Sequence, residues 1–504
     1  MASNAVSSSA ISRVLGYQLT TGNFINTTPN LPARIAILGE ANAANQTDLD
    51  LTPVSVTSAQ QAGELYGFGS PIYNVMRILR PVSGGGVGAV ETVVYPQAEA
   101  GSAESQVNTI TVTGTATANA THYVKVAGRT SLDGETYAVL VKDGDDVATV
   151  AGKIADAVNG VLGCPFSAVA AAGVVTFTSK WKGETAASLV LEMFTDSVPA
   201  GMTYTFGVTN DAVGVPSVTT ALNLFGNEWN NIVLNTYGTD DDVMDALEAY
   251  NGIPSATDPT GRYAGITFKP FVALAGNVSP TGLPAEVIGR RTQVTNVICP
   301  APNSSGHAME AAANVARLLG VQMNDNPELA IAGQSYPDMP TAATIGDFAN
   351  YDDRNLMAKS GVSTVDLVNG AYQVQELVTT YHPVGELNPQ FRYVRSLVQD
   401  FNVKFGYRLL EEIYVQDHVI ANDEDTIKVG KFVKPMTWKS VLGNYFDDLV
   451  ERGIIVDADF SKDSLIVNLS TTNPDRLETF FKYKRSGFAR VGATTVEAGF
   501  NFGV

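Results

Sequence analysis

Four histidines are the residues of this chain that could take part in the widest range of chemistry. His122, His307, His382 and His418 lie far apart, and none belongs to an HExxH motif or to a close pair with the spacing of metal ligands. A nucleophilic serine would need a histidine base and an orienting acid, usually around a GxSxG turn, which the sequence lacks. The spacing favours ordinary packed or surface imidazoles. A hydrolase whose triad is assembled only by folding is the alternative from another class.

Glycine-rich and acidic segments offer no recognisable ligand loop. The phosphate-binding pattern GxxxxGK[ST] is absent, and residues 84–88 (GGGVG) follow an expected helix and precede an expected strand. That order is wrong for phosphate binding at the start of a helix. The acidic run 423–425 lacks the spaced ligands and central glycine of a calcium loop, and 240–242 suits the first turn of a helix. We expect no enzyme, no bound metal and no cofactor.

A basic cluster lies near the end of the chain. Lys482, Lys484, Arg485 and Arg490 alternate with aromatic residues, a pattern also found in nucleic-acid-binding proteins. The net charge of −19 argues against that function, and nearly all of the excess acid lies before residue 380. Two interpretations remain: a solvated turn, or a contact with an acidic protein surface.

Length and composition indicate several folded domains. A chain of 504 residues exceeds what one hydrophobic core usually holds, and its 45% hydrophobic and 16% charged residues suit globular domains. Cys164 and Cys299 are the only cysteines, so a disulfide framework is not expected and a reducing cytoplasm fits best. We find no apolar run near the ~20 residues of a membrane helix, and the first residues do not resemble a secretory signal.

Strand and helix patterns divide the chain. Buried-strand patterns alternate with amphipathic helices before residue 98 and after residue 216, whereas Thr- and Val-rich runs of period two lie between them. We therefore predict an α/β and α+β multidomain fold, with a central layered sheet and helices, a β-rich inserted domain, an α+β C-terminal domain and extended strand arms at both termini. The predicted parts are an N-terminal arm 1–25, the central domain 26–97 and 217–376, the inserted outer domain 98–216, the C-terminal domain 377–491 and a C-terminal strand 492–504.

Several local signals predict where helices start and stop. Ser70 before Pro71 is a typical cap followed by a first-turn proline. The Ala-rich helix after residue 306 is expected to end at Gly320, and Thr437 is expected to cap a later helix. Residues 476–485 (RLETFFKYKR) fit either a helix or a strand.

The last residues alternate between apolar and polar or small side chains up to the end of the sequence. Val496, Ala498, Phe500, Phe502 and Val504 would share one face of an extended strand. Such a strand can pair within its own sheet, or it can add to the sheet edge of a neighbouring molecule. The alternation alone does not separate these two outcomes.

The first residues contain a similar but less regular pattern. Ile11, Leu15, Tyr17 and Leu19 would lie on one side of an extended segment, although Arg13 interrupts that row. We therefore expect the C-terminal strand to be the better candidate for exchange between subunits.

Many short segments, taken in order, resemble the tail sheath proteins of contractile phages. The resemblance is to the Mu-like type, whose family region is named for a subtilisin-like fold, and it covers most of the chain. The segments that carry it are RIAILGE, ELYGFGSPIYNVMRILR, DGDDVATVAGKIADAVNG with GVVTFTSKWKGE, ALNLFGNEWNNIVLNTY, LVTTYH, VIANDEDT and KPMTWKSVL with VERGIIVD. None of these segments is a catalytic signature.

The resemblance implies a structural homo-oligomer of stacked hexameric rings that polymerises helically around a tail tube. Contraction would drive the tube through the host envelope for genome delivery, with the terminal arms shared between neighbours. The implied partners are the tube, baseplate and tail terminator proteins, without direct nucleic-acid or membrane contact. The C-terminal domain would face the tube, where the basic cluster is the candidate contact. The implied location is the virion tail, assembled in the host cytoplasm; a tailocin or secretion-system sheath is the related alternative.

Overall fold

The computed structural model describes Ser9, Ser12 and residues 28–500, apart from residues 133, 196–198, 283, 284, 387, 388 and 429. The chain forms two compact units. The larger unit comprises Asn30–Phe405 and Arg485–Val504, and the smaller unit comprises Met1–Pro29 and Gly406–Lys484.

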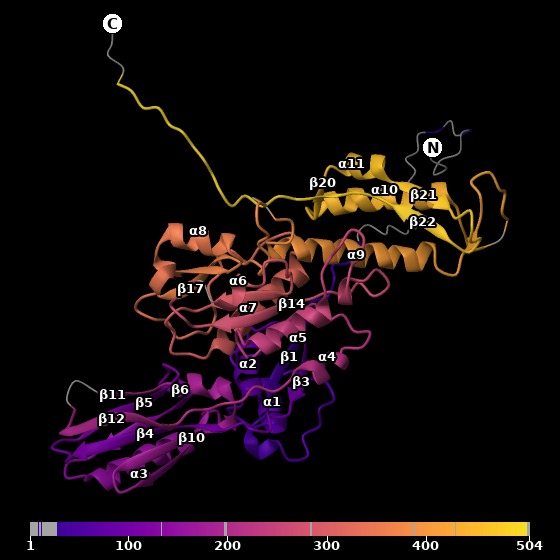
Figure 1. The fold of residues 1–504 in the computed structure, drawn as a ribbon. Helices are drawn as coiled ribbons and strands as arrows, with labels where there is room; N and C mark the ends of the chain where they lie inside the picture. Colours follow the sequence, from indigo (N-terminus) through magenta and orange to yellow (C-terminus); the bar gives the residue numbers. More distant parts are fainter. Residues whose placement is uncertain are drawn as a thin grey trace. The chain divides into compact units, whose positions relative to one another are not determined.

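A six-stranded sheet forms the centre of the larger unit (Figure 1). Its strand order is β15-β14-β13-β1-β3-β2; the first five strands are parallel, and β2 pairs antiparallel with β3. The pairing brings strands before and after the insertion together, since β1 lies between β3 and β13. The strands are β1 (Arg34–Glu40), β2 (Val54–Ser55), β3 (Glu91–Gln97), β13 (Ile232–Asn235), β14 (Val272–Asn277) and β15 (Asn296–Pro300).

Helices cover both faces of this sheet, as expected for parallel strands that are apolar on both sides. Ile35 and Ile37 point into the core that contains α2 and α7, whereas Ala36 and Leu38 point into a second core with α4 and α5. A further helix, α1, packs on α2. The helices are α1 (Ala59–Tyr66), α2 (Pro71–Leu79), α4 (Thr219–Asn223), α5 (Asp241–Asn251) and α7 (Ala308–Asp325).

Two of the predicted helix boundaries have different outcomes. The Ser70 hydroxyl accepts a hydrogen bond from the Tyr73 amide at 3.1 Å, so the predicted cap of α2 is confirmed. The predicted end at Gly320 is wrong, because α7 continues to Asp325. A Cβ at position 320 would lie 3.2 Å from Ile35 Cδ1, so this glycine provides close packing of the helix on β1 rather than a stop.

The segment between β3 and β13 forms two larger antiparallel sheets and a short β6–β7 pair (Figure 1). One has the order β12-β4-β10-β9 and the other β11-β5-β8, and α3 packs beside them. Large aromatic side chains, among them Phe177 and Trp181, fill the core. The elements are β4 (Ser105–Gly114), β5 (Ala120–Val126), β6 (Ser131–Leu132), β7 (Glu135–Thr136), β8 (Ala138–Val141), α3 (Val147–Asn159), β9 (Phe166–Ala171), β10 (Val174–Lys182), β11 (Leu191–Thr195) and β12 (Met202–Asn210).

The larger unit also contains residues 377–405, which the sequence groups with the C-terminal domain. The reason is hydrogen bonding: the Thr380 amide donates to the carbonyl oxygen of Asn296 at the start of β15, at 3.0 Å, and Val378 forms a β-bridge with Tyr393. The long helix α9 begins in this segment. The remaining elements here are α6 (Ala285–Ile288), α8 (Tyr351–Lys359), β16 (Thr364–Val368), β17 (Ala371–Glu376) and α9 (Val394–Tyr414).

The smaller unit packs around α10. Trp438, Leu442 and Phe446 are buried along one side of this helix. Thr437 is not its cap, because the helix already starts at Pro435, which suits a first helical position. Residues 476–485, ambiguous from sequence, contain a strand, β22, that pairs antiparallel with β21. The elements are β18 (Val419–Ile420), β19 (Phe432–Val433), α10 (Pro435–Glu451), β20 (Ile455–Val456), α11 (Ala458–Ser464), β21 (Ile466–Leu469) and β22 (Leu477–Phe480), followed by β23 (Lys484–Arg485) at the unit boundary.

Among the helices of the described residues, none has both the length and the apolar composition needed to cross a bilayer.

Candidate functional site

The segment after β23, which we call the C-terminal arm (residues 486–504), is extended over its described part. Figure 1 draws it as a yellow trace without helix or strand. Every residue from 491 to 500 is exposed, including Val496 at 78% and Phe500 at 91%. Val496 and Ala498 belong to no strand of the described chain, while Phe502 and Val504 lie outside the described residues.

The N-terminal arm residues Ile11, Leu15, Tyr17 and Leu19 also lie outside the described residues. The first continuously described residue is Thr28, in the smaller unit. Its hydroxyl donates to Asp448 Oδ2 at 2.9 Å, and Arg452 Nη1 donates to its carbonyl oxygen at 2.8 Å. Both partners lie at the C-terminal end of α10, so the N-terminal segment is attached there at residue 28.

An ion pair within the larger unit fixes the chain directly before the C-terminal arm. Arg485 makes two hydrogen bonds to the Asp400 carboxylate, from Nε at 2.7 Å and from Nη2 at 2.5 Å. Its third donor, Nη1, binds the carbonyl oxygen of Gln390 at 3.0 Å. This two-pronged arrangement is the strongest geometry open to an arginine–carboxylate pair.

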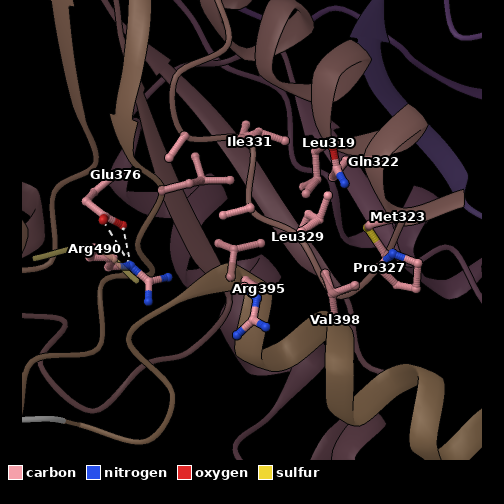
Figure 2. Close-up of a pocket in the computed structure, with 14 residues that line it drawn as sticks. Leu319, Gln322, Met323, Pro327, Leu329, Ile331, Glu376, Arg395, Val398 and Arg490 are labelled. Atoms are coloured by element: carbon pink, nitrogen blue, oxygen red, sulfur yellow. Dashed lines mark hydrogen bonds and ion pairs between the residues drawn. The ribbon is translucent and has the colours of Figure 1, made fainter. Parts of the chain in front are cut away.

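Arg490 makes a second attachment five residues further on. Its Nε lies 2.9 and 3.0 Å from the two oxygens of Glu376, at the end of β17, and Figure 2 shows the two side chains facing each other. The guanidinium also lies over the ring of Tyr393, 3.7 Å from its centroid. Burial raises the pKa of Glu376, whereas the charge of Arg490 opposes that shift.

Arg395, near the start of α9, binds the arm between these two attachments. Its Nη1 donates to the carbonyl oxygen of Ser486, and its Nη2 donates to the hydroxyl of the same serine, each at 2.7 Å. Gln399 Nε2 donates to that hydroxyl as well, also at 2.7 Å. The ring of Phe488 lies 5.5 Å from the Arg395 guanidinium and 5.2 Å from that of Arg490, so it sits between two cations.

The predicted tube-contact residues thus have partners within their own chain. Arg485 and Arg490 bind the carboxylates described above, and Lys484 lies 2.5 Å from Asp457 Oδ2 and over the ring of Phe460. Lys482 is exposed, and within the described part of the chain its side chain forms no ion pair. Three of the four basic side chains are therefore engaged inside the subunit.

A small cavity lies beside the Arg490–Glu376 pair (Figure 2). Apolar side chains of α7, α9 and the loop after α7 line it, with Glu376, Arg395 and Arg490 on one side. Its volume is about 20 Å³, which holds about one water molecule. The cavity is too small for a substrate, so it marks imperfect packing under the arm. The labelled apolar lining residues are Leu319, Met323, Pro327, Leu329, Ile331 and Val398.

The structure does bring one serine and one histidine together, at the edge of a depression of about 630 Å³ beside the carboxyl ends of β13 and β14. Ser188 Oγ lies 3.2 Å from His307 Nδ1, but it donates its hydrogen to the carbonyl oxygen of Thr185 at 3.0 Å. A hydroxyl that donates to Thr185 cannot at the same time donate to His307, as a nucleophile would have to do. Burial also lowers the pKa of His307 to about 4, too low for an efficient base near neutral pH.

The other three histidines are distributed through the fold. His122 is buried beside Tyr204, the ring of His382 contacts the Thr380 carbonyl, and His418 is near the Gln416 carbonyl. Within the described ranges, no cluster of three or more His, Cys, Asp or Glu side chains could hold a metal ion.

The β21–β22 hairpin of the smaller unit has an exposed apolar pair. Ile466 and Phe480 are opposite each other in the antiparallel register, and they are 49% and 53% exposed. The two strands form a two-stranded sheet, so among the described strands the outer edge of each has no partner. Short edges with apolar side chains are suited to accept an additional strand.

Two solved structures of sheath proteins cover nearly all of the chain at low identity. The sheath tail protein of Desulfitobacterium hafniense is 10% identical, covers 94% of this chain and 100% of its own, and has a TM-score of 0.42. The contracted helical sheath of the anti-feeding prophage is 9% identical, covers 98% and 99%, and has a TM-score of 0.43.

A curated relative gives the more specific similarity. The Mu-like prophage FluMu tail sheath protein of Haemophilus influenzae is 25% identical over an alignment of 443 residues, and the match covers 84% of each chain. The predicted resemblance to Mu-like tail sheath proteins is confirmed by this match. No protein-family model matches the chain.

Proposed function

We propose that this protein is the structural subunit of a contractile tail sheath, which polymerises helically around a tail tube and contracts to drive the tube through the host envelope. The observation that carries the proposal is the similarity to a Mu-like tail sheath protein along 84% of both chains. A match of this extent is longer than any one of the predicted domains, so it does not concern one shared domain alone.

The chemistry of the described residues supports a structural rather than an enzymatic function. The Ser188 hydroxyl donates to the Thr185 carbonyl oxygen, and the pKa of the neighbouring His307 is lowered to about 4 by burial. The cavity of Figure 2 holds about one water molecule. Contraction of a sheath needs no bound cofactor, because a switch between two packings of the same subunits can release the energy.

Strand donation is the contact that would link the subunits. The alternating residues Val496, Ala498 and Phe500 are exposed along this extended segment. The β21–β22 hairpin exposes Ile466 and Phe480. The arm of one copy adds to this hairpin in a second copy, so that main-chain hydrogen bonds supply affinity and the apolar pair supplies register. The N-terminal arm makes a second link of the same kind.

The assembly that follows is a stack of hexameric rings in a virion tail, formed in the host cytoplasm. Its other partners are a tail tube protein, which the smaller unit faces, and the baseplate and tail terminator proteins. Since Lys484, Arg485 and Arg490 bind carboxylates of their own chain, Lys482 is the basic residue best suited to contact the tube.

Negative-stain electron microscopy of the purified chain tests this function. A sheath subunit forms rods or rings whose abundance depends on salt and protein concentration. A population of uniform single particles of monomer size, together with hydrolytic activity, would instead support the hydrolase alternative.

A further inference from the structure

The C-terminal arm is partly buried against its own subunit up to Arg490 and is exposed beyond it. Before this point, side chains alternate as in a docked strand: Ser486, Phe488 and Arg490 are half-buried, whereas Gly487 and Ala489 are exposed. From residue 491 to residue 500 every position is exposed, whichever way its side chain points. The surface of the subunit that receives the arm therefore ends at Arg490.

The contacts before this point are numerous and charge-assisted. Two ion pairs, Arg485–Asp400 and Arg490–Glu376, enclose the segment. The side chains of both pairs are between 13% and 24% exposed, so solvent screens them less than it screens a fully exposed pair. Between the pairs, Arg395 binds the backbone and side chain of Ser486.

We propose that these residues form a root clamp, which keeps residues 485–490 on their own subunit and leaves only residues 491–504 to reach a second copy. We define the root clamp as Arg395, Arg485 and Arg490 with Asp400, Glu376 and Ser486. The inference rests on the proposed sheath function, because the second copy receives the arm only in an assembly. The clamp residues are positioning residues, since the strand contact itself is made further along the arm.

The clamp sets how far the arm can reach. A fully extended chain spans at most ~3.3–3.6 Å per residue, so residues 491–504 reach about 46–50 Å from Arg490. Releasing residues 485–490 would add roughly 20 Å. A longer flexible link lowers the effective concentration of the arm at its target and admits more distant neighbours. The clamp therefore restricts each arm to the neighbour whose hairpin lies within this distance.

A charge-swap series tests the clamp. The variants are R490E, E376R and the double variant E376R/R490E, with K359E as the matched control because Lys359 is exposed and lies outside the clamp. Hydrogen exchange of peptides covering residues 485–490 in the purified full chain measures docking, and the fraction of protein in regular rods measures assembly. Thermal unfolding confirms that each variant is folded.

We expect each single variant to exchange at least ten-fold faster over residues 485–490 and to form fewer regular rods. The double variant should regain most of both properties, whereas K359E should exchange like the wild type. Wild-type exchange in both single variants would overturn the clamp, and so would faster exchange with normal rods. If the wild type itself forms no rods, the sheath function fails, while the exchange of residues 485–490 still reports separately on the clamp.

Discussion

The guanidinium of Arg129, in the turn between β5 and β6, lies 3.0 Å from Oε2 of Glu310, in the first turn of α7. Arg77 of α2 binds the other oxygen of the same carboxylate at 2.8 Å. Glu310 is 1% exposed, so it joins the β-rich insertion to the central sheet within one buried network. Burial alone would raise the pKa of Glu310, but the two arginines, Arg129 first, lower it to about 2.

We predict that E310Q destabilises the larger unit strongly. The substitution removes the buried carboxylate and leaves the two arginines only Asp338, which is 40% exposed, as an ionised partner. The free energy of unfolding should therefore fall by up to ~3–5 kcal/mol. Urea unfolding at neutral pH measures the change. The control is R408A, which removes an exposed pair on α9 and should change stability by less than ~0.5 kcal/mol. Equal, small effects of both variants would show that the network contributes little.

A second buried carboxyl gives a pH-dependent prediction. Glu40 ends β1 and is 2% exposed; burial, and secondly the charge of Glu99, raise its pKa from 4.5 to about 8. Below pH 4.5 Glu40 is protonated in both the folded and the unfolded chain. Between pH 4.5 and about 8 the unfolded chain ionises while the folded chain does not, so stability falls as the pH rises. Above about pH 8 Glu40 is ionised in both the folded and the unfolded chain, so the loss of stability no longer changes with pH.

The variant E40Q, which cannot ionise, should therefore stabilise the protein more as the pH rises. We expect little difference from the wild type at pH 4.5 and a gain of roughly 3–5 kcal/mol at pH 8.5. Urea unfolding at several pH values measures it, with the exposed Glu424 in E424Q as the control. A difference between E40Q and the wild type that does not change with pH would contradict the assignment.

The close approach of α7 to the central sheet gives a third prediction. A Cβ at Gly276, in β14, would lie 1.6 Å from the carbonyl oxygen of Ala308, at the start of α7. The backbone must move, so G276A should lower the free energy of unfolding by roughly 3 kcal/mol or more. Gly152 in α3 has no atom within 4 Å of its added Cβ, and G152A should stabilise by ~0.5–1 kcal/mol. Thermal or urea unfolding compares the two, and a tolerated G276A would contradict the packing.

Local sequence signals predict much of the fold. The apolar run at residues 33–40 predicts β1, and Ser70 before Pro71 predicts the start of α2, since each depends on neighbouring residues alone. Gly320 fails as a stop signal because Ile35, far away in the sequence, packs against it. Thr437 fails as a cap because Pro435, two residues earlier, already begins the helix. Tertiary packing overrides the local preference in the first case, and a competing local signal does so in the second.

The candidate site is likewise only partly predictable from the sequence. The alternation of Val496, Ala498 and Phe500 is visible in the sequence, and the structure adds that these side chains are exposed. The carboxylate that binds Arg490 is 114 residues away, at Glu376, and only the fold brings the two together. In the sequence alone the basic cluster therefore suggests a binding surface, although in the fold most of its charges are paired with carboxylates of the same chain.

The hairpin of the smaller unit gives a fourth prediction. The double variant I466S/F480S removes an exposed apolar pair, so the isolated subunit should keep its melting temperature within a few degrees. Rod formation should fall severely, because the acceptor strand loses its apolar contacts. The matched control is V419S, at a position that is 63% exposed in the same unit. Normal rods from the double variant would exclude this hairpin as the acceptor.

The central claim is that the C-terminal arm links sheath subunits. Negative-stain electron microscopy of the wild type beside a variant lacking residues 494–504 tests it most directly, with thermal unfolding as the check that the variant is folded. We predict rods or stacked rings for the wild type, and folded particles without regular rods for the truncated chain. Rods of normal length and appearance from the truncated chain would contradict strand donation by the C-terminal arm.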